Sequence, residues 1–383
     1  MANTFLTPKM IISGADALTN AQSELAKAGK KAFIVTDATM VKLGNVSLLE
    51  DILKKCDIDY YIFSEVNFEP NDIVVIEGKN KYKENNCDFL VALGGGSPID
   101  TAKAISILLD NDAPLSSYMG KIIDIKRPAL VAIPTTAGTG SEATKFTIIN
   151  DTNTKVKMLL TGPCLIPDLA IIDPAFSKSA PKSVTSHTGI DALCHAIESY
   201  TSRKAQPLSD TFALSAIKRI FANLKKCYDN GDDIEARVQM SLAALEAGIS
   251  FNNSSVTIVH GMSRPMGALF HVPHGLSNAM LLGECMNYVV DGAYDRFADI
   301  ARYLSLTNDE DDVKAAHIFL DALNQLLKDL NVPTMSEYGI DSKEYFDSID
   351  KMAHDAYASG SPSNTIKKIE VEDMITLYKK IYR

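Results

Sequence analysis

In the first part of the chain, short runs of consecutive apolar residues alternate with segments whose apolar residues recur every three or four positions. The longest apolar runs lie at residues 32–36 (AFIVT), 60–63, 89–93 (FLVAL) and 129–133 (ALVAI), with shorter candidates at 146–149, 157–160 and 169–172. Such runs predict buried strands, and the segments between them, such as 15–28 and 71–85, predict helices. Strands that alternate with helices predict a parallel sheet covered on both faces.

Beyond about Pro181 the apolar pattern changes to a helical one throughout. Amphipathic helices are predicted from three groups of apolar residues: Phe212, Ile217, Ile220, Phe221 and Leu224; Val238, Leu242, Leu245 and Ile249; and Val313, Ala316, Leu320, Leu323, Leu327 and Leu330. We therefore expect an α/β domain over residues 1–180 and an all-helical domain over residues 181–383.

The net charge, the cysteines and the lack of long apolar stretches argue against several classes of binding partner and location. The 383 residues carry a formal net charge of −10, which argues against a nucleic-acid or anionic-membrane partner, because both need a basic surface. Six scattered cysteines without a CxxC pair are typical of reduced thiols. The sequence shows no signal-peptide pattern and no apolar stretch long enough to span a bilayer, so we expect a cytoplasmic protein that handles small molecules.

A glycine-rich turn follows the apolar run 89–93 directly. Residues 94–100 (GGGSPID) place a tight turn between a predicted strand and a predicted helix, with Ser97 suited to the N-cap and Pro98 to the first helical position. Glycines let the backbone approach a ligand, and a helix N-terminus offers free N–H groups to an anion. The turn predicts a pyrophosphate site, although GxGxxG is absent and a turn needed only for packing is the alternative.

A second polar loop strengthens the nucleotide hypothesis. Residues 134–142 (PTTAGTGSE) follow the run 129–133 and are rich in hydroxyl groups. Two loops that each follow a strand would lie at one edge of a parallel sheet, where open α/β sheets bind ligands. Asp37, at the end of the run 32–36, could accept hydrogen bonds from ribose hydroxyls and repel a 2′-phosphate, which favours NAD over NADP; a simple helix cap is the alternative.

Four of the seven histidines fall into two clusters. Asp191 and His195 are four residues apart, which places both on one face of a helix, and residues 260–275 (HGMSRPMGALFHVPHG) contain His260, His271 and His274. Carboxylate and imidazole are common ligands of divalent transition metals. A lone buried histidine or a helical ion pair would be the ordinary interpretation of either cluster alone, but the two together indicate a metal site.

In their order along the chain, the motifs GGGSPID, PTTAGTGSE, GIDALCHAIESY and HGMSRPMGALFHVPHG resemble the signature series of iron-containing alcohol dehydrogenases. The resemblance implies a Rossmann-like N-terminal domain, an all-α C-terminal domain of the dehydroquinate synthase-like architecture, and an active cleft between them. The metal ligands it implies are Asp191, His195, His260 and His274, holding Fe²⁺ or, as in some relatives, Zn²⁺. The NAD contacts it implies are Asp37, Gly95, Gly96, Ser97, Asp100, Thr135, Thr136, Thr139 and Lys157.

One position departs from the family pattern. Many members carry a histidine four residues after the third ligand, where it is thought to assist proton transfer, whereas this chain has Arg264. Arginine stays protonated, so it cannot relay a proton, and His271 or solvent is left for that task. Arg264 could instead face an anionic group of the substrate or cofactor, or form a structural ion pair.

The resemblance implies a hydride transfer between NAD(H) and a small alcohol/aldehyde pair, a primary alcohol or a diol, with the metal acting as a Lewis acid. Three alternatives remain open: a glycerol dehydrogenase-like enzyme acting on a polyol or short hydroxy acid, a dehydroquinate synthase-like lyase that uses NAD transiently, and a nucleotide-binding module with a structural metal. A homo-oligomer, dimeric or larger, is expected from the family.

Overall fold

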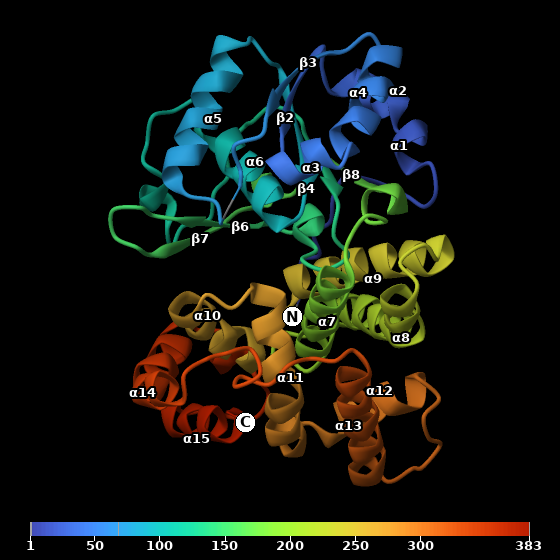
Figure 1. Ribbon diagram of the computed structural model, residues 1–383, viewed down its shortest axis with the longest axis vertical. Helices are drawn as coiled ribbons and strands as arrows, with labels where there is room; N and C mark the ends of the chain where they lie inside the picture. Colours follow the sequence, from blue (N-terminus) through green and yellow to red (C-terminus); the bar gives the residue numbers. More distant parts are fainter. Residues whose placement is uncertain (1, 68, 383) are drawn as a thin grey trace. The chain divides into compact units, whose positions relative to one another are not determined.

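The computed structural model describes residues 2–67 and 69–382 and divides the chain into two compact units (Figure 1). One unit is Leu6–Ala180, and the other contains Pro181 onward together with the described residues before Leu6. Phe5 shows why the first residues join the helical unit: its ring stacks on Phe212, with the ring centroids 5.8 Å apart. The hydrophobic pattern did not predict this association.

The first unit is built on a parallel six-stranded sheet in the order β1-β8-β5-β4-β2-β3. These strands and the two-stranded antiparallel sheet β6-β7 have the following bounds: β1 Met10–Ser13, β2 Lys31–Val35, β3 Asp59–Phe63, β4 Phe89–Gly94, β5 Leu130–Pro134, β6 Phe146–Asn150, β7 Lys157–Thr161 and β8 Leu169–Ile172. Each of the seven apolar runs coincides with a strand to within one or two residues. The edge strand β1 was not predicted, because two of its four residues are exposed and the other two are only half-buried.

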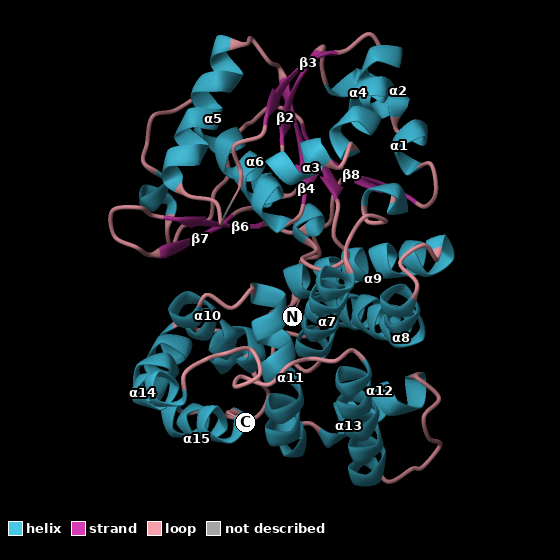
Figure 2. Ribbon diagram, in the orientation of Figure 1, coloured by secondary structure: helices cyan, strands magenta, loops and turns pink. Residues whose placement is uncertain are grey.

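Helices cover both faces of the parallel sheet, as Figure 2 shows. On β2, Phe33 and Val35 belong to one apolar cluster and Ala32 and Ile34 to another, because alternate side chains of a strand point to opposite faces. The first cluster includes residues of α5 (Asp72–Glu84) and α6 (Gly96–Leu108), and the second includes residues of α1 (Ala17–Asn20), α2 (Gln22–Ala28) and α4 (Asn45–Lys55). The α/β fold expected from the sequence is confirmed.

The chain opens a crevice between the carboxyl ends of β2 and β4. After β2 it passes through α3 (Ala38–Lys42) to α4 on one face, and after β4 it enters α6 on the opposite face. Since the two connections diverge from neighbouring strands, the backbone leaves a gap where they part, and this is the point at which doubly wound folds bind ligands.

The glycine turn differs in detail from the prediction. Helix α6 begins at Gly96 with Gly95 as its N-cap, so Ser97 and Pro98 lie inside the first turn and Ser97 caps nothing. The reason is Gly94, whose φ of 158° is a conformation that other residues rarely adopt, and whose missing Cβ would lie 2.5 Å from Pro98 Cγ. The chain therefore turns earlier than the capping pattern indicated.

A buried lysine attaches the β6-β7 sheet to α6. Lys103 is fully buried, and its Nζ donates to Thr144 O and Phe146 O at 2.9 and 2.8 Å, as well as to the hydroxyls of Thr144 and Ser141. Burial lowers the pKa of Lys103 to about 8, which the carboxylates of Asp100 and Glu142 partly oppose. One cation thus satisfies several otherwise unpaired acceptors.

The second unit is helical throughout its described residues. Its helices are α7 Lys182–Tyr200, α8 Pro207–Asp229, α9 Ile234–Asn253, α10 Ile258–Phe270, α11 His274–Val289, α12 Tyr294–Tyr303, α13 Asp312–Asp329, α14 Ser342–Ala358 and α15 Val371–Ile381. The three predicted amphipathic helices correspond to α8, α9 and α13, and α7 packs against α8, α9 and α11. Over residues 2–67 and 69–382, no helix is both long and apolar enough to cross a membrane.

Replacing Lys103 with methionine tests the attachment of the β6-β7 sheet. We expect Lys103→Met to lower the free energy of unfolding by about 2–4 kcal/mol, because buried acceptors lose their donor and the carboxylate of Asp100 loses a nearby positive charge. Urea unfolding followed by circular dichroism measures this change. The control is Lys9→Met, since the Lys9 side chain is 84% exposed and its ion pair with Asp168 should contribute little. Equal unfolding midpoints for the two variants would refute the anchoring role.

Candidate metal centre and nucleotide site

Three helices bring the four candidate ligands together. Asp191 and His195 lie one turn apart on α7, His260 lies in the first turn of α10, and His274 is the first residue of α11. The start of α11 can approach α7 closely because residue 275 is glycine: a Cβ there would lie 2.6 Å from the His187 carbonyl oxygen. The local packing therefore depends on Gly275.

The ligand atoms surround one carboxylate oxygen. Asp191 Oδ1 lies 3.9 Å from His195 Nδ1, 3.6 Å from His260 Nε2 and 3.7 Å from His274 Nε2. Ligands bound at about 2.1 Å in a tetrahedron lie about 3.4 Å from one another, so these separations are close to those of a ligand set around a single ion. The donor set of one carboxylate and three imidazoles suits Fe²⁺ or Zn²⁺.

Burial and neighbouring charges shift the pKa values of the candidate ligands. Burial alone would raise the pKa of Asp191, but the imidazoles of His195, His274 and His260 hold it well below its usual range. Burial lowers the pKa of His195 to about 3, so its imidazole is neutral at pH 7. Its Nδ1 is buried without a hydrogen-bond partner, and an unsatisfied buried nitrogen facing a carboxylate is what a metal ligand requires in the absence of its ion.

His260 differs from His195 in having carboxylates on two sides. Burial alone would lower its pKa, but Glu198 and Asp191 together raise it to about 9. The Nδ1 of His260 donates to Glu198 Oε2, and its Nε2 faces Asp191. The two nitrogens of this ring therefore have separate partners.

Two further residues in contact with the ligands were missed by the sequence analysis. Asn278 Nδ2 donates to Asp191 Oδ1 at 2.7 Å and lies 3.1 Å from His260 Nε2 and 3.3 Å from His274 Nε2. Glu198 contacts His260 from the opposite side. The spacing could have indicated both, because Asn278 follows His274 by four residues and Glu198 follows His195 by three.

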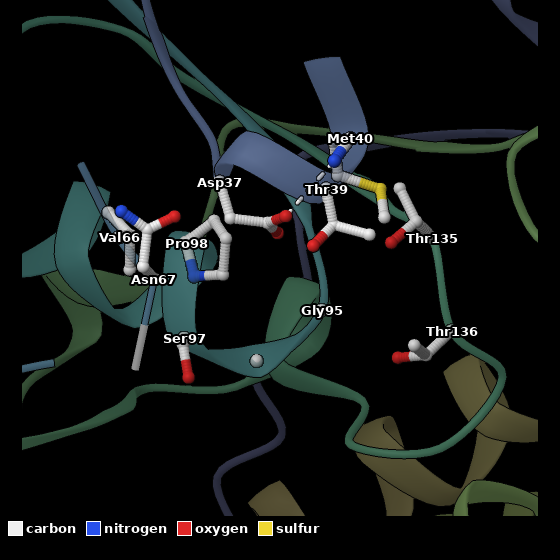
Figure 3. Close-up of a pocket in the computed structure, with 11 residues that line it drawn as sticks. Asp37, Thr39, Met40, Val66, Asn67, Gly95, Ser97, Pro98, Thr135 and Thr136 are labelled. Carbon is white, nitrogen blue, oxygen red and sulfur yellow. Dashed lines mark hydrogen bonds between the residues drawn. The ribbon is translucent and has the colours of Figure 1, made fainter. Parts of the chain in front are cut away.

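The nucleotide candidates line a cavity of about 410 Å³ at the carboxyl ends of β2, β4 and β5, shown in Figure 3. Its walls come from four segments: the start of α3, residues 66–67 after β3, the glycine turn and the loop after β5. Of the residues expected to contact NAD, six line it: Asp37, Gly95, Gly96, Ser97, Thr135 and Thr136. The carboxylate of Asp37 also accepts from Met40 N at 3.0 Å, so it caps α3 while it faces the cavity.

The other three cofactor candidates lie outside this lining. The Asp100 carboxylate accepts from Ser141 Oγ and from Ile148 N, at 2.5 and 3.0 Å, so it holds the neighbouring loop and strand in place. Lys157 pairs with Glu69, with Nζ and Oε1 2.7 Å apart. Thr139 lies beside the turn, because a Cβ on Gly96 would be 3.2 Å from Thr139 Cγ2.

The two candidate catalytic residues occupy different positions on α10. Arg264 lies one turn after His260 and donates from Nη1 to Ser361 Oγ at 2.9 Å. His271 is exposed at the C-cap of the helix, with a left-handed φ of 54°. Within the described residues no carboxylate forms an ion pair with Arg264, so the structural ion pair considered for it is not formed.

Both halves of the chain match family models. Residues 8–174 match the model described as iron-containing alcohol dehydrogenase, and residues 185–382 match the C-terminal model of the Fe-containing alcohol dehydrogenase family. The chain belongs to the iron-containing alcohol dehydrogenase family. As a member it is a metal-dependent oxidoreductase with NAD and iron as the family's cofactors, which confirms the reaction class and cofactors expected from the sequence.

Individual relatives cover nearly the whole chain. A choline dehydrogenase of Bacillus subtilis is 37% identical over 96% of this chain and 92% of its own length. An NAD-dependent methanol dehydrogenase of Bacillus methanolicus is 34% identical over 99% of both chains. The crystal structure of a 1,3-propanediol oxidoreductase aligns with a TM-score of 0.96 at 31% identity and covers all of both chains. These names span cationic, small neutral and diol substrates, so family membership leaves the substrate open.

His274 supplies a test of the candidate metal centre that does not depend on turnover. A ligand at 100 times its dissociation constant stabilises the native state by about 2.7 kcal/mol, so Zn²⁺ should raise the melting temperature of the metal-stripped protein. We expect His274→Ala to lose most of this increase. His271→Asn is the matched control, since asparagine tolerates the left-handed backbone of residue 271. If both variants respond to Zn²⁺ like the wild type, His274 is not a ligand.

Proposed function

We propose that this member of the iron-containing alcohol dehydrogenase family interconverts a small primary alcohol or diol with its aldehyde, using NAD(H) as the hydride carrier. The observation that carries the proposal is the convergence of three imidazole nitrogens on Asp191 Oδ1 at 3.6–3.9 Å, one of them a buried nitrogen without a hydrogen-bond partner. The cavity between β2, β4 and β5 supports the use of a nucleotide cofactor.

The proposed ligands are Asp191, His195, His260 and His274. When bound, a divalent metal supplies Lewis acidity to the oxygen of the alcohol or aldehyde. The chain itself contributes the buried carboxylate of Asp191 and three imidazoles to this ligand set. The His274 side chain is 47% exposed, whereas those of Asp191, His195 and His260 are at most 7% exposed. We propose that the substrate enters from the His274 side.

The α/β unit is proposed to hold NAD through two kinds of contact. The N-terminus of α6 presents unpaired N–H groups next to Gly95 and Gly96, where the backbone offers no side chain to block a pyrophosphate. Asp37, on the opposite wall of the cavity, can accept hydrogen bonds from ribose hydroxyls and would repel a 2′-phosphate. The side chains of Asp100 and Lys157 are proposed to act through the structure of the neighbouring strands, because each already has a partner.

Proton transfer is proposed to use His271 or solvent. Arg264 keeps its proton at any working pH and cannot serve as the relay. Its guanidinium donates to one neutral hydroxyl in the described residues, which leaves donors for an anionic group of a substrate such as a short hydroxy acid. We also propose that the bound metal is iron, with zinc as the alternative, and that the protein is a cytoplasmic homo-oligomer.

Metal reconstitution tests the proposed function. Protein purified without oxygen and stripped of metal should form no NADH from NAD⁺ and alcohols. Adding Fe²⁺ or Zn²⁺ back should restore NADH absorbance with one or more members of a panel of primary alcohols, diols and hydroxy acids. Activity that is unaffected by stripping would contradict the proposal. Bound metal and NAD without net NADH across the panel would instead favour the dehydroquinate synthase-like lyase, because such an enzyme recycles its cofactor.

A substitution at Asp37 tests the nucleotide assignment. Asp37→Ser removes the charge while a hydroxyl can still cap α3, so the fold should be retained. We expect the ratio of kcat/KM for NADP⁺ to that for NAD⁺ to rise at least about tenfold, which corresponds to removing about 1.4 kcal/mol of repulsion. The control is Asp16→Ser, because Asp16 is exposed. Asp168→Ser would be less suitable, because it breaks the ion pair with Arg127. An unchanged ratio would remove Asp37 from the cofactor site.

A further inference from the structure

Glu198 is a fully buried carboxylate that the proposed chemistry does not use. It lies on α7, seven residues after Asp191 and three after His195, so the three side chains share one face of the helix. Burying an ionised carboxylate is costly unless its oxygens are hydrogen-bonded. The hydrogen-bond partners of Glu198 therefore indicate its role.

Both oxygens of Glu198 are occupied. Oε1 accepts from Thr257 Oγ1 at 2.7 Å and from Val259 N at 2.6 Å, which ties the carboxylate to the start of α10. Oε2 accepts from His260 Nδ1 at 2.5 Å. An ionised carboxylate has no proton to donate, so the proton of this last bond resides on His260 Nδ1.

The position of that proton decides which nitrogen of His260 is available to a metal. With Nδ1 protonated, the neutral imidazole carries its lone pair on Nε2, and Nε2 is the atom that lies 3.6 Å from Asp191 Oδ1. The hydrogen bond to Glu198 also fixes the rotation of the ring and makes Nε2 a stronger electron donor. Glu198 therefore acts on the ligand atom from the opposite side of the ring.

We propose that Glu198 is a positioning residue that selects the tautomer and orientation in which His260 binds the metal. The proposal rests on the proposed function only in taking His260 as a ligand. It concerns the affinity of the site for the metal ion, which can be measured without substrate.

A second ion held by Cys194, Glu198 and His260 is the competing interpretation of the same cluster. These three groups are close enough to share an ion, and Cys194 Sγ lies 3.7 Å from His260 Nδ1. Binding an ion there would require Nδ1 to lose its proton and Glu198 to release at least one of its hydrogen bonds. We therefore expect one ion per chain.

Glu198→Gln is the direct test, because glutamine keeps the size of the side chain but turns one oxygen into an N–H donor. If its carbonyl stays with Thr257 and Val259, its amide N–H faces His260 Nδ1 and favours the tautomer whose Nε2 carries the proton. We expect the dissociation constant for Zn²⁺, measured against a chromophoric chelator without substrate, to rise by about 10–100-fold. The far-ultraviolet circular dichroism of the metal-free variant should match that of the wild type.

Glu246→Gln is the matched control. Glu246 lies on α9 of the same unit and accepts from Arg219 Nε at 3.1 Å through both oxygens, so the variant also loses a half-buried charge pair. It should bind Zn²⁺ within about twofold of the wild type. Equal Zn²⁺ affinity in Glu198→Gln and wild type, or equal losses in both variants, would overturn the positioning role. Two Zn²⁺ per wild-type chain would favour the second-ion interpretation and also overturn it. A wild type that binds no Zn²⁺ would refute both the inference and the proposed function.

A measurement on the wild type covers the case in which Glu198→Gln does not fold. With ¹⁵N at the seven histidines and Zn²⁺ bound, we expect an imidazole whose Nε2 has the shift of a metal ligand and whose Nδ1 proton exchanges slowly with water. His274 cannot give this signal, since its side chain is 47% exposed, whereas that of His260 is 4% exposed. The absence of such an imidazole would overturn the inference.

Discussion

The buried carboxylate of Asp191 is the constraint on which the helical unit depends. A carboxylate that is 2% exposed needs compensating partners: the Asn278 amide donates to it, and imidazole nitrogens from α7, α10 and α11 lie 3.6–3.9 Å from its Oδ1. α10 and α11 begin within two residues of their candidate ligands, His260 and His274, whereas α7 carries Asp191 and His195 in its interior. The glycine at 275, the start of α11 at His274 and the hydrogen bonds of Glu198 to the start of α10 all serve this convergence.

In the α/β unit, the course of the backbone determines where the cavity forms. The connections after β2 and β4 leave neighbouring strands toward opposite faces, so the sheet opens at that point. Gly94 adopts a backbone conformation that side chains disfavour, and Gly95 and Gly96 leave the start of α6 uncovered. The buried Lys103 and the half-buried Asp100 then hold the following loop and the β6-β7 sheet against α6. The hydrogen bonds of Lys103 and Asp100 thus support the wall of the cavity.

The sequence predicted most of the fold and the Asp and His side chains that lie close together, because both depend on local pattern. Buried parallel strands appear as apolar runs, and Asp191 and His195 appear as a helical pair. Contacts between distant residues were not predictable in this way. The stacking of Phe5 on Phe212, the edge strand β1 and the hydrogen bonds of Asp100 each depend on a partner far away in the sequence. Glu198 and Asn278 lay at detectable spacings, but only the folded chain shows which atoms they contact.

The central claim is that a single ion among Asp191, His195, His260 and His274 is required for hydride transfer to NAD⁺. The most direct measurement titrates Fe²⁺ or Zn²⁺ into metal-stripped protein while NADH formation is followed with a saturating alcohol. We expect the rate to rise linearly with added metal and to stop rising at one equivalent per chain, and we expect no rise in Asp191→Asn. A rate that is already maximal before any metal is added, or an Asp191→Asn variant that reaches the wild-type rate, would contradict it.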